Sequence, residues 1–149
     1  MIMQLSKFLP YQLSVLSNKV SQGISKSYRK QHNISISEWR VLIILSDNRE
    51  QTAKELVEYS QMDKVRISRT VKVLLDKKLI TQKVCQNDAR SKKYKLTNSG
   101  NDLIEAVKPK ALEYEQLLIS MLSEKQLNDF RNTIEILNQQ TDKILQENS

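Results

Sequence analysis

Glycine and proline are scarce in this chain of 149 residues, which contains two of each. Sandwiches and barrels need many tight turns, and phosphate-binding loops need several glycines, so the composition disfavours all three. A single cysteine cannot form a disulfide within the chain, as expected in a reducing compartment. No apolar run is long enough to span a bilayer, and the opening MIMQLSKFLPYQLSVLSNK lacks the features of a signal peptide. We therefore expect a cytoplasmic protein without a membrane partner.

Residues that carry out catalysis are also few. The single histidine, His32, falls at the end of a predicted helix, where a capping or surface role is favoured over catalysis. No cluster of cysteine and histidine has metal-ligand spacing. We expect no enzymatic activity, no cofactor and no metal site.

The charge of the chain is segregated. Residues 62–99 contain eleven Lys or Arg and three Asp or Glu, whereas the rest of the chain contains thirteen basic and fourteen acidic residues. The net charge of +7 therefore arises in one contiguous segment. Such a segment is typical of a surface that binds a polyanion.

Apolar spacing and capping residues predict a mainly helical chain. A first amphipathic helix begins near Leu9, has Pro10 in its first turn, and carries a stripe that continues to Tyr28, with Asn33 as a stop. The stripe comprises Leu9, Leu13, Leu16, Val20, Ile24 and Tyr28. The S-x-x-E sequence at Ser35 predicts a buried central helix to about Leu45, followed by a polar turn over residues 47–50.

Two short helices follow, separated by only a few residues. Thr52 and Glu55 form a second capping-box pattern for a helix to about Ser60, and Asp63 is an N-cap for a helix to about Lys77. Such a pair crosses steeply, as in a helix-turn-helix. One face of the second helix has the composition of a core seam: Ile67, Thr70, Val71 and Leu74.

Residues 85–97, CQNDARSKKYKLT, predict a loop between a strand at 79–85 and a returning strand at 93–96. Asp88 and Arg90 are expected at its tip. Thr97 should then cap a helix to about Met121, and Ser123 a last helix. The last helix has the stripe Leu127, Phe130, Ile134, Leu137, Thr141 and Leu145. Because a compact central module cannot cover both terminal stripes, we expect a homodimer through the terminal helices.

The other face of the second short helix carries polar donors suited to DNA and one apolar side chain, Val65. The donors are Lys64, Ser68, Arg69 and Lys72, with Arg66 at the side of the face. A solvated surface is the alternative explanation. However, the N-terminal part of such a helix enters the major groove, where arginine can bond guanine and an aliphatic side chain can meet a thymine methyl group.

The segments FLPYQLSVLSNKVS, ISEWRVLIIL, MDKVRISRTVKVLL and DARS…KLTNSG resemble the MarR family of winged helix-turn-helix regulators in order and spacing. The resemblance implies a DNA-binding lobe at 35–97 and a helical dimerisation region at 1–34 and 98–149. It implies that Arg90 enters the minor groove of double-stranded DNA, oriented by a charge-assisted hydrogen bond that its guanidinium donates to Asp88, with phosphate contacts from Lys92, Lys93 and Lys95. Lys78 departs from the family, which usually has glycine there, and would be mildly strained in a left-handed conformation.

The family pattern also implies a repressor that responds to a small aromatic or phenolic anion, bound near Trp39 and Arg40. An equally good explanation of these two residues is a core tryptophan and a surface ion-pair partner. Two alternatives to this function stay open. Cys85, near Lys83 and Arg90, could act as a redox sensor, although no second cysteine could resolve a sulfenate. An architectural protein would instead bind random and promoter DNA equally.

Overall fold

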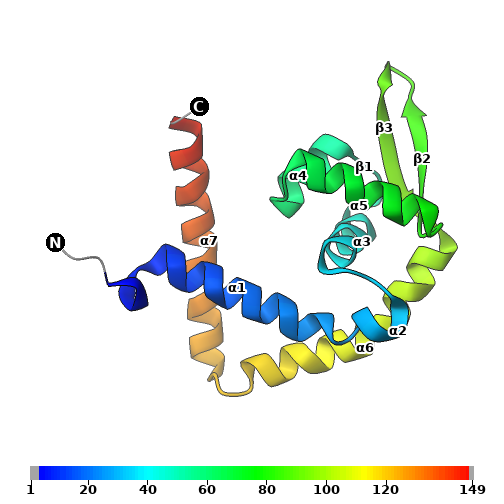
Figure 1. The fold of residues 1–149 in the computed structure, drawn as a ribbon. Helices are drawn as coiled ribbons and strands as arrows, with labels where there is room; N and C mark the ends of the chain where they lie inside the picture. The colour runs from blue at the N-terminus through cyan, green and yellow to red at the C-terminus, as the bar shows by residue number, and fades with distance from the viewer. Residues whose placement is uncertain (1–3, 148–149) are drawn as a thin grey trace. The chain divides into compact units, whose positions relative to one another are not determined.

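The computed structural model describes residues 4–147 and is mainly helical with a small three-stranded sheet (Figure 1). The chain divides into two compact units, Met1–Ala111 and Leu112–Ser149. The predicted lobe at 35–97 lies within the first unit, and residues 1–3 and 148–149 of the predicted dimerisation region lie outside the described residues. Across residues 4–147, no helix is both long and apolar enough to cross a membrane.

The first unit begins with the 3₁₀ turn η1 (Leu5–Lys7), then α1 (Leu9–Ser25) and α2 (Arg29–His32). Pro10 lies in the first turn of α1, as predicted, and Asn33 ends α2 in a left-handed conformation with φ 52°. The prediction that one helix continues to Tyr28 is wrong. The chain turns after Ser25, which lets the Tyr28 ring enter the core and stack on Trp39 at 4.9 Å between ring centroids.

The central helix α3 (Ile36–Asn48) is buried through Trp39, Val41, Leu42 and Leu45, as its apolar run predicts. The Ser35 hydroxyl accepts a hydrogen bond from the Glu38 amide at 3.1 Å. The helix extends three residues beyond the predicted end, so Asp47 and Asn48 are helical and not part of a polar turn. Asn48 donates from its side chain to the Ile44 carbonyl at 3.1 Å, which accounts for part of this extra length.

Helices α4 (Ala53–Ser60) and α5 (Lys64–Asp76) confirm the predicted helix-turn-helix. Thr52 and Glu55 form a complete capping box at the start of α4. The Asp63 carboxylate caps α5 by accepting from the Arg66 amide at 2.8 Å. The four seam residues of α5 are all buried: Ile67, Thr70, Val71 and Leu74. Helix α3 packs against both α4 and α5.

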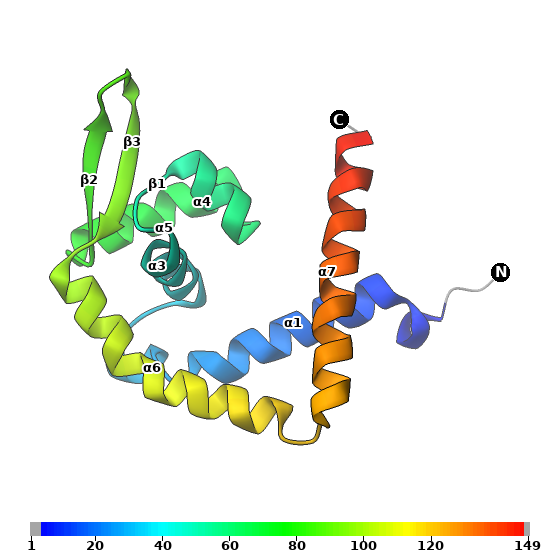
Figure 2. The same cartoon turned by 180° about the vertical axis from the view of Figure 1, so that it is seen from behind.

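The sheet contains β1 (Gln51–Thr52), β2 (Ile80–Cys85) and β3 (Asp88–Leu96), in the order β1-β3-β2 with antiparallel pairing. Strand β1 was not predicted. The hairpin of β2 and β3 stands out beyond α5 (Figures 1 and 2). Its turn is Gln86–Asn87 only, so the predicted loop is too long and Asp88 and Arg90 are the first residues of β3 and not its tip. Lys78 has φ 58°, the left-handed conformation that the sequence predicts.

Helix α6 (Asn98–Ile119) is capped by the preceding residue, Thr97. The Thr97 hydroxyl accepts a hydrogen bond from the Gly100 amide at 3.1 Å and donates one to the Lys78 carbonyl at 2.7 Å. A side chain at Gly100 would collide with the main-chain carbonyl of Leu79, so glycine is required where α6 leaves the sheet. The helix ends two residues before the predicted Met121.

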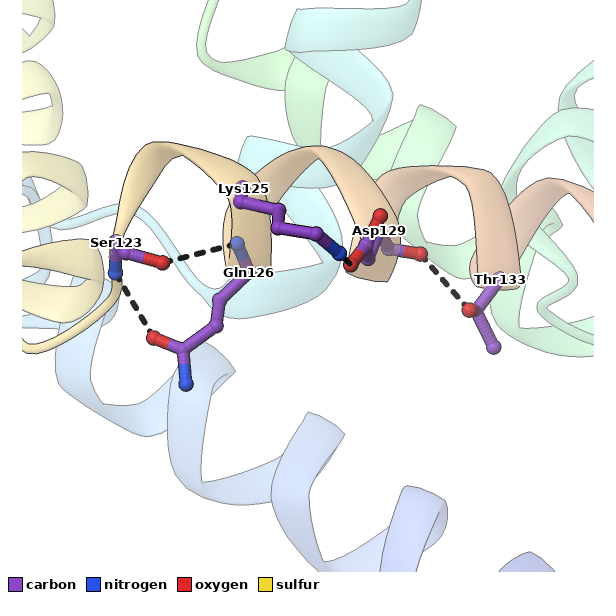
Figure 3. A network of polar contacts seen from close by, with 5 residues as sticks. All are labelled: Ser123, Lys125, Gln126, Asp129 and Thr133. Carbon is purple, nitrogen blue, oxygen red and sulfur yellow. Dashed lines mark hydrogen bonds and ion pairs between the residues drawn. The ribbon is translucent and has the colours of Figure 1, made fainter.

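The second unit contains α7 (Glu124–Glu147), which begins with a reciprocal cap (Figure 3). The Gln126 amide donates to the Ser123 hydroxyl at 3.1 Å, and the Ser123 amide donates to the Gln126 side chain at 2.9 Å. Farther along, Lys125 pairs with Asp129 at 2.6 Å. These local contacts define the start of α7, and none of its described residues is buried.

Candidate nucleic-acid interface

The face of α5 opposite the buried seam is fully open to solvent. It holds the six side chains that the sequence predicts: Lys64, Val65, Arg66, Ser68, Arg69 and Lys72. Val65 is 60% exposed, although apolar side chains on a helix with a buried seam are usually directed inward. Donors and an aliphatic side chain therefore lie together on one surface.

The first turn of α5 places positive charge at the positive end of the helix. It contains Lys64 and Arg66 and no acidic residue, and only the N-cap Asp63 is negative. Cations at a helix N-terminus are unfavourable by roughly 0.3–1 kcal/mol each. A phosphate that approaches this end of the helix would interact favourably with both the cations and the helix N-terminus.

Arg66 is not wholly free. Its Nε donates to the hydroxyl of Ser37, in the first turn of α3, at 2.8 Å. The sequence contains no signal for this contact, because 29 residues separate the two side chains.

The geometry of Asp88 and Arg90 differs from the expected one. The Asp88 carboxylate accepts a hydrogen bond from the main-chain amide of Arg90 at 2.9 Å. Within residues 4–147 it forms no ion pair with the Arg90 guanidinium. The aspartate therefore orders the backbone at the start of β3 and leaves the arginine side chain exposed.

The three lysines of β3 lie in different electrostatic surroundings. Lys83 of β2 pairs with the Glu50 carboxylate at 2.8 Å, and this hydrogen bond lowers the pKa of Glu50, with smaller contributions from Lys95 and Lys93. Lys93 also lowers the pKa of Glu55, although the main cause there is the Thr52 amide. Lys92 is exposed, and among residues 4–147 it forms no ion pair. It is thus a clearer candidate for a phosphate contact.

Cys85 ends β2, half-buried, at the point where the register of the hairpin shifts. Its partner across the ladder is Asp88.

Trp39 and Arg40 border a cavity of about 260 Å³ between α1, α3 and α4. Trp39 also belongs to the core, at 9% exposure. The Arg40 guanidinium approaches the Ser21 hydroxyl at 3.5 Å. The described chain therefore gives Arg40 a weak partner, not the ion pair considered as an alternative.

The structure adds Tyr28 to this cavity. Its side chain is 0% exposed, and its hydroxyl finds no hydrogen-bond partner among residues 4–147. Burial raises the pKa of Tyr28 to about 12, against the opposing influence of Arg40 and Arg29. Sequence reasoning assigned Tyr28 to an apolar stripe, and nothing in that pattern indicates an unsatisfied hydroxyl.

The lobe is a winged helix-turn-helix, which is a class of DNA-binding module. It combines a helix-turn-helix, exposed donors on the second helix and a basic hairpin. Residues 32–91 match the model of the MarR family. The chain is 26% identical, over 79% of its length and 80% of the relative, to the uncharacterized HTH-type transcriptional regulator SAV2265 of Staphylococcus aureus strain Mu50.

Solved structures of transcriptional regulators share this fold. A MarR/EmrR family transcriptional regulator from Acinetobacter sp. ADP1 superposes with a TM-score of 0.85 at 26% identity, covering 95% of this chain and 99% of that one. The PcaV transcriptional regulator of Streptomyces coelicolor, in complex with its natural ligand, shares the fold with a TM-score of 0.79 at 14% identity, over 93% and 97% of the chains. Residues 32–91 therefore match the MarR family, and the chain has the winged helix-turn-helix fold of DNA-binding transcriptional regulators.

Proposed function

We propose that this regulator is a homodimeric, sequence-specific repressor that a small aromatic or phenolic anion releases from DNA. In this proposal α5 occupies the major groove and Arg90 the minor groove. The observation that carries it is the exposed face of α5, which combines donors, one apolar side chain and uncompensated positive charge.

The two ends of the proposed DNA contact have different tasks. Arg69 lies on the exposed face of α5 and has the reach to form a bidentate hydrogen bond with a base. Arg90 and Lys92 lie on β3, where Arg90 would enter a narrow minor groove of strong negative potential and Lys92 would meet a phosphate. Asp88 supports this arrangement by fixing the backbone that carries Arg90.

Apolar side chains left uncovered support the homodimer. In the second unit, Phe130 is 44% and Ile134 40% exposed. In the first unit, Leu9, Leu13 and Leu16 on α1 are also exposed. A second copy of the chain that covers these faces would gain about 1.5–3 kcal/mol per large side chain fully buried. Sedimentation should show a dimer at micromolar concentration, and a folded monomer there would exclude this assembly.

The cavity beside Trp39 supports a ligand with an apolar ring and an acceptor group. Trp39 and Ile43 supply apolar walls, Arg40 a positive charge, and Tyr28 a hydroxyl without a partner in the described chain. A carboxylate or phenolate could accept from Arg40 while its ring contacts the walls, and it would reach the buried Tyr28 hydroxyl only if the cavity wall opened. PcaV, which shares this fold, has been crystallised with its natural ligand.

Selection of bound duplexes from a random DNA pool tests the function directly. Enrichment of one motif, followed by tight binding of that duplex and weak binding of a scrambled one, is expected. Equal binding of both duplexes would instead identify an architectural protein.

Two matched variants test the division of tasks. Arg69→Ala should weaken the selected duplex by about 1–3 kcal/mol and relax its preference at one or two positions. Lys92→Ala should weaken selected and scrambled duplexes alike and reduce the salt dependence. Identical behaviour of the two variants across sequences would contradict the assigned roles.

A further inference from the structure

Ser37 lies in the first turn of α3, outside the surface assigned to DNA. It is buried, with 9% of its surface exposed. Its hydroxyl nevertheless accepts the Nε hydrogen of Arg66 at 2.8 Å, across the gap between α3 and α5. Arg66 itself is exposed, so its Nε is hydrogen-bonded to α3 while the rest of the side chain faces solvent.

This contact determines which part of the guanidinium is free. Arginine has five N–H donors, one of them on Nε. When Ser37 takes Nε, the side-on fork that includes Nε is occupied. The four N–H groups on the two terminal nitrogens remain, and they form the end-on fork that matches two oxygens of a phosphate.

Arg66 is also placed differently from Arg69. Arg69 lies on the face opposite the seam, and within residues 4–147 its guanidinium forms no ion pair with α3. Arg66 leans toward α3, at the edge of that face. A side chain at the edge of a recognition helix meets the phosphate backbone beside the groove, not the base edges in its centre.

We propose that Ser37 is a positioning residue for DNA binding, which holds the guanidinium of Arg66 so that its terminal nitrogens meet a DNA phosphate. The inference rests on the proposed DNA-binding surface and adds a residue that this surface does not include. Ser37 contributes by ordering Arg66 before DNA arrives, since an arginine that is already immobilised loses less conformational entropy on binding.

The test is a double-mutant cycle on the full chain, with the duplex selected from the random pool and with fluorescence anisotropy over a range of salt concentrations. The variants are Ser37→Ala, Arg66→Ala and the pair. Ser46→Ala, which changes an exposed serine in the same helix, is the matched control. Thermal melting of each variant reports the fold.

Ser37→Ala should weaken binding by about 3- to 10-fold in the presence of Arg66. In the Arg66→Ala background it should have no further effect, since the residue it positions is gone. Arg66→Ala should lower the slope of log K against log salt by about 0.9 for each phosphate that the arginine neutralises, on scrambled DNA as well as selected DNA. Ser46→Ala should bind as the unmodified protein does.

A further variant, Arg66→Lys, distinguishes loss of the Ser37–Arg66 contact from a general effect of Ser37→Ala on the fold. Arg66→Lys keeps the charge but lacks the Nε donor, so Ser37→Ala should leave its affinity unchanged. Equal losses from Ser37→Ala in the unmodified, Arg66→Lys and Arg66→Ala backgrounds would show a merely structural role and overturn the proposal, as would no loss in any of them. Failure of the unmodified protein to prefer any duplex would instead refute the proposed function.

Discussion

The carboxylate of Glu38 accepts a hydrogen bond from Nζ of Lys77 at 2.5 Å, and so joins the first turn of α3 to the residue that follows α5. Lys77 also donates to the Asn33 carbonyl at 2.5 Å. The neighbouring Ser37 holds Arg66 near the other end of α5. Two adjacent residues of α3 thus contact basic side chains from both ends of the recognition helix, which limits how far α5 can shift within the lobe.

Glu38→Gln should therefore reduce the free energy of unfolding by about 1 kcal/mol, because Glu38 is nearly buried and Lys77 would keep only neutral acceptors. Urea denaturation measures the change. Glu105→Gln is the control: its ion pair with Lys108, at 3.4 Å, is exposed on both sides, so the expected change is within about 0.5 kcal/mol. Equal effects of the two substitutions would contradict a special role for the Glu38 contact.

Asp88 can be tested by separating its charge from its hydrogen bond. Asp88→Asn keeps an oxygen that can accept from the Arg90 amide and removes a negative charge beside a polyanion. It should bind the selected duplex at least as tightly as the unmodified protein. Asp88→Ala removes the acceptor and should bind several-fold more weakly, at a cost of about 1 kcal/mol. A titration at fixed salt decides: if both variants lose affinity equally, Asp88 acts through its charge.

The hydroxyl of Tyr28 should ionise only at high pH. The chain contains five tyrosines. Burial raises the Tyr28 pKa to about 12 from 10.0, so this residue favours the protonated form when folded. Its contribution to stability is complete below pH 10 and is lost as the pH rises through 12. Ultraviolet absorbance of the phenolate should show a late ionisation step near pH 12 that Tyr28→Phe removes, whereas Tyr94, whose pKa burial also raises, is left unchanged by this substitution.

Tyr28→Phe should also separate folding from effector binding. The variant keeps the ring on Trp39 and removes a buried hydroxyl that lacks a partner in the described chain, so stability should be equal or greater by up to about 1 kcal/mol. Release of the selected duplex by salicylate, a phenolic anion, should need a higher concentration. Unchanged release would show that salicylate does not contact the Tyr28 hydroxyl.

The capping box of α4 predicts a loss of stability in acid. The Thr52 amide lowers the pKa of Glu55 below 4.5, so this carboxylate favours the ionised form when folded. Its contribution is present above pH 4.5 and is lost as the pH falls through the lower folded-state pKa. The difference in melting temperature between the unmodified protein and Glu55→Gln should narrow over that acidic range. A difference that stays constant throughout this range would contradict the linkage.

Helix starts could be predicted from the sequence because their hydrogen bonds span only three residues. Ser35, Thr52, Asp63, Thr97 and Ser123 each accept from an amide three positions along the chain. The seam of α5 was predictable for a similar reason, since residues three and four apart share a helix face. The charged face of α5 then follows as the remainder of the same helix.

Other features depend on contacts between segments that are distant in the sequence. Helix α1 ends at Ser25 and not at Tyr28 because the Tyr28 ring packs on Trp39, which an apolar stripe cannot distinguish from a continuing helix. Strand β3 begins at Asp88, opposite Cys85 at the end of β2, so polar residues that are typical of a loop become a strand only when the two strands pair. The hydrogen bond between Arg66 and Ser37 can form only when α3 packs against α5. Local hydrogen bonds and helix periodicity are written in the sequence, whereas these three arrangements arise only when long-range packing brings the partners together.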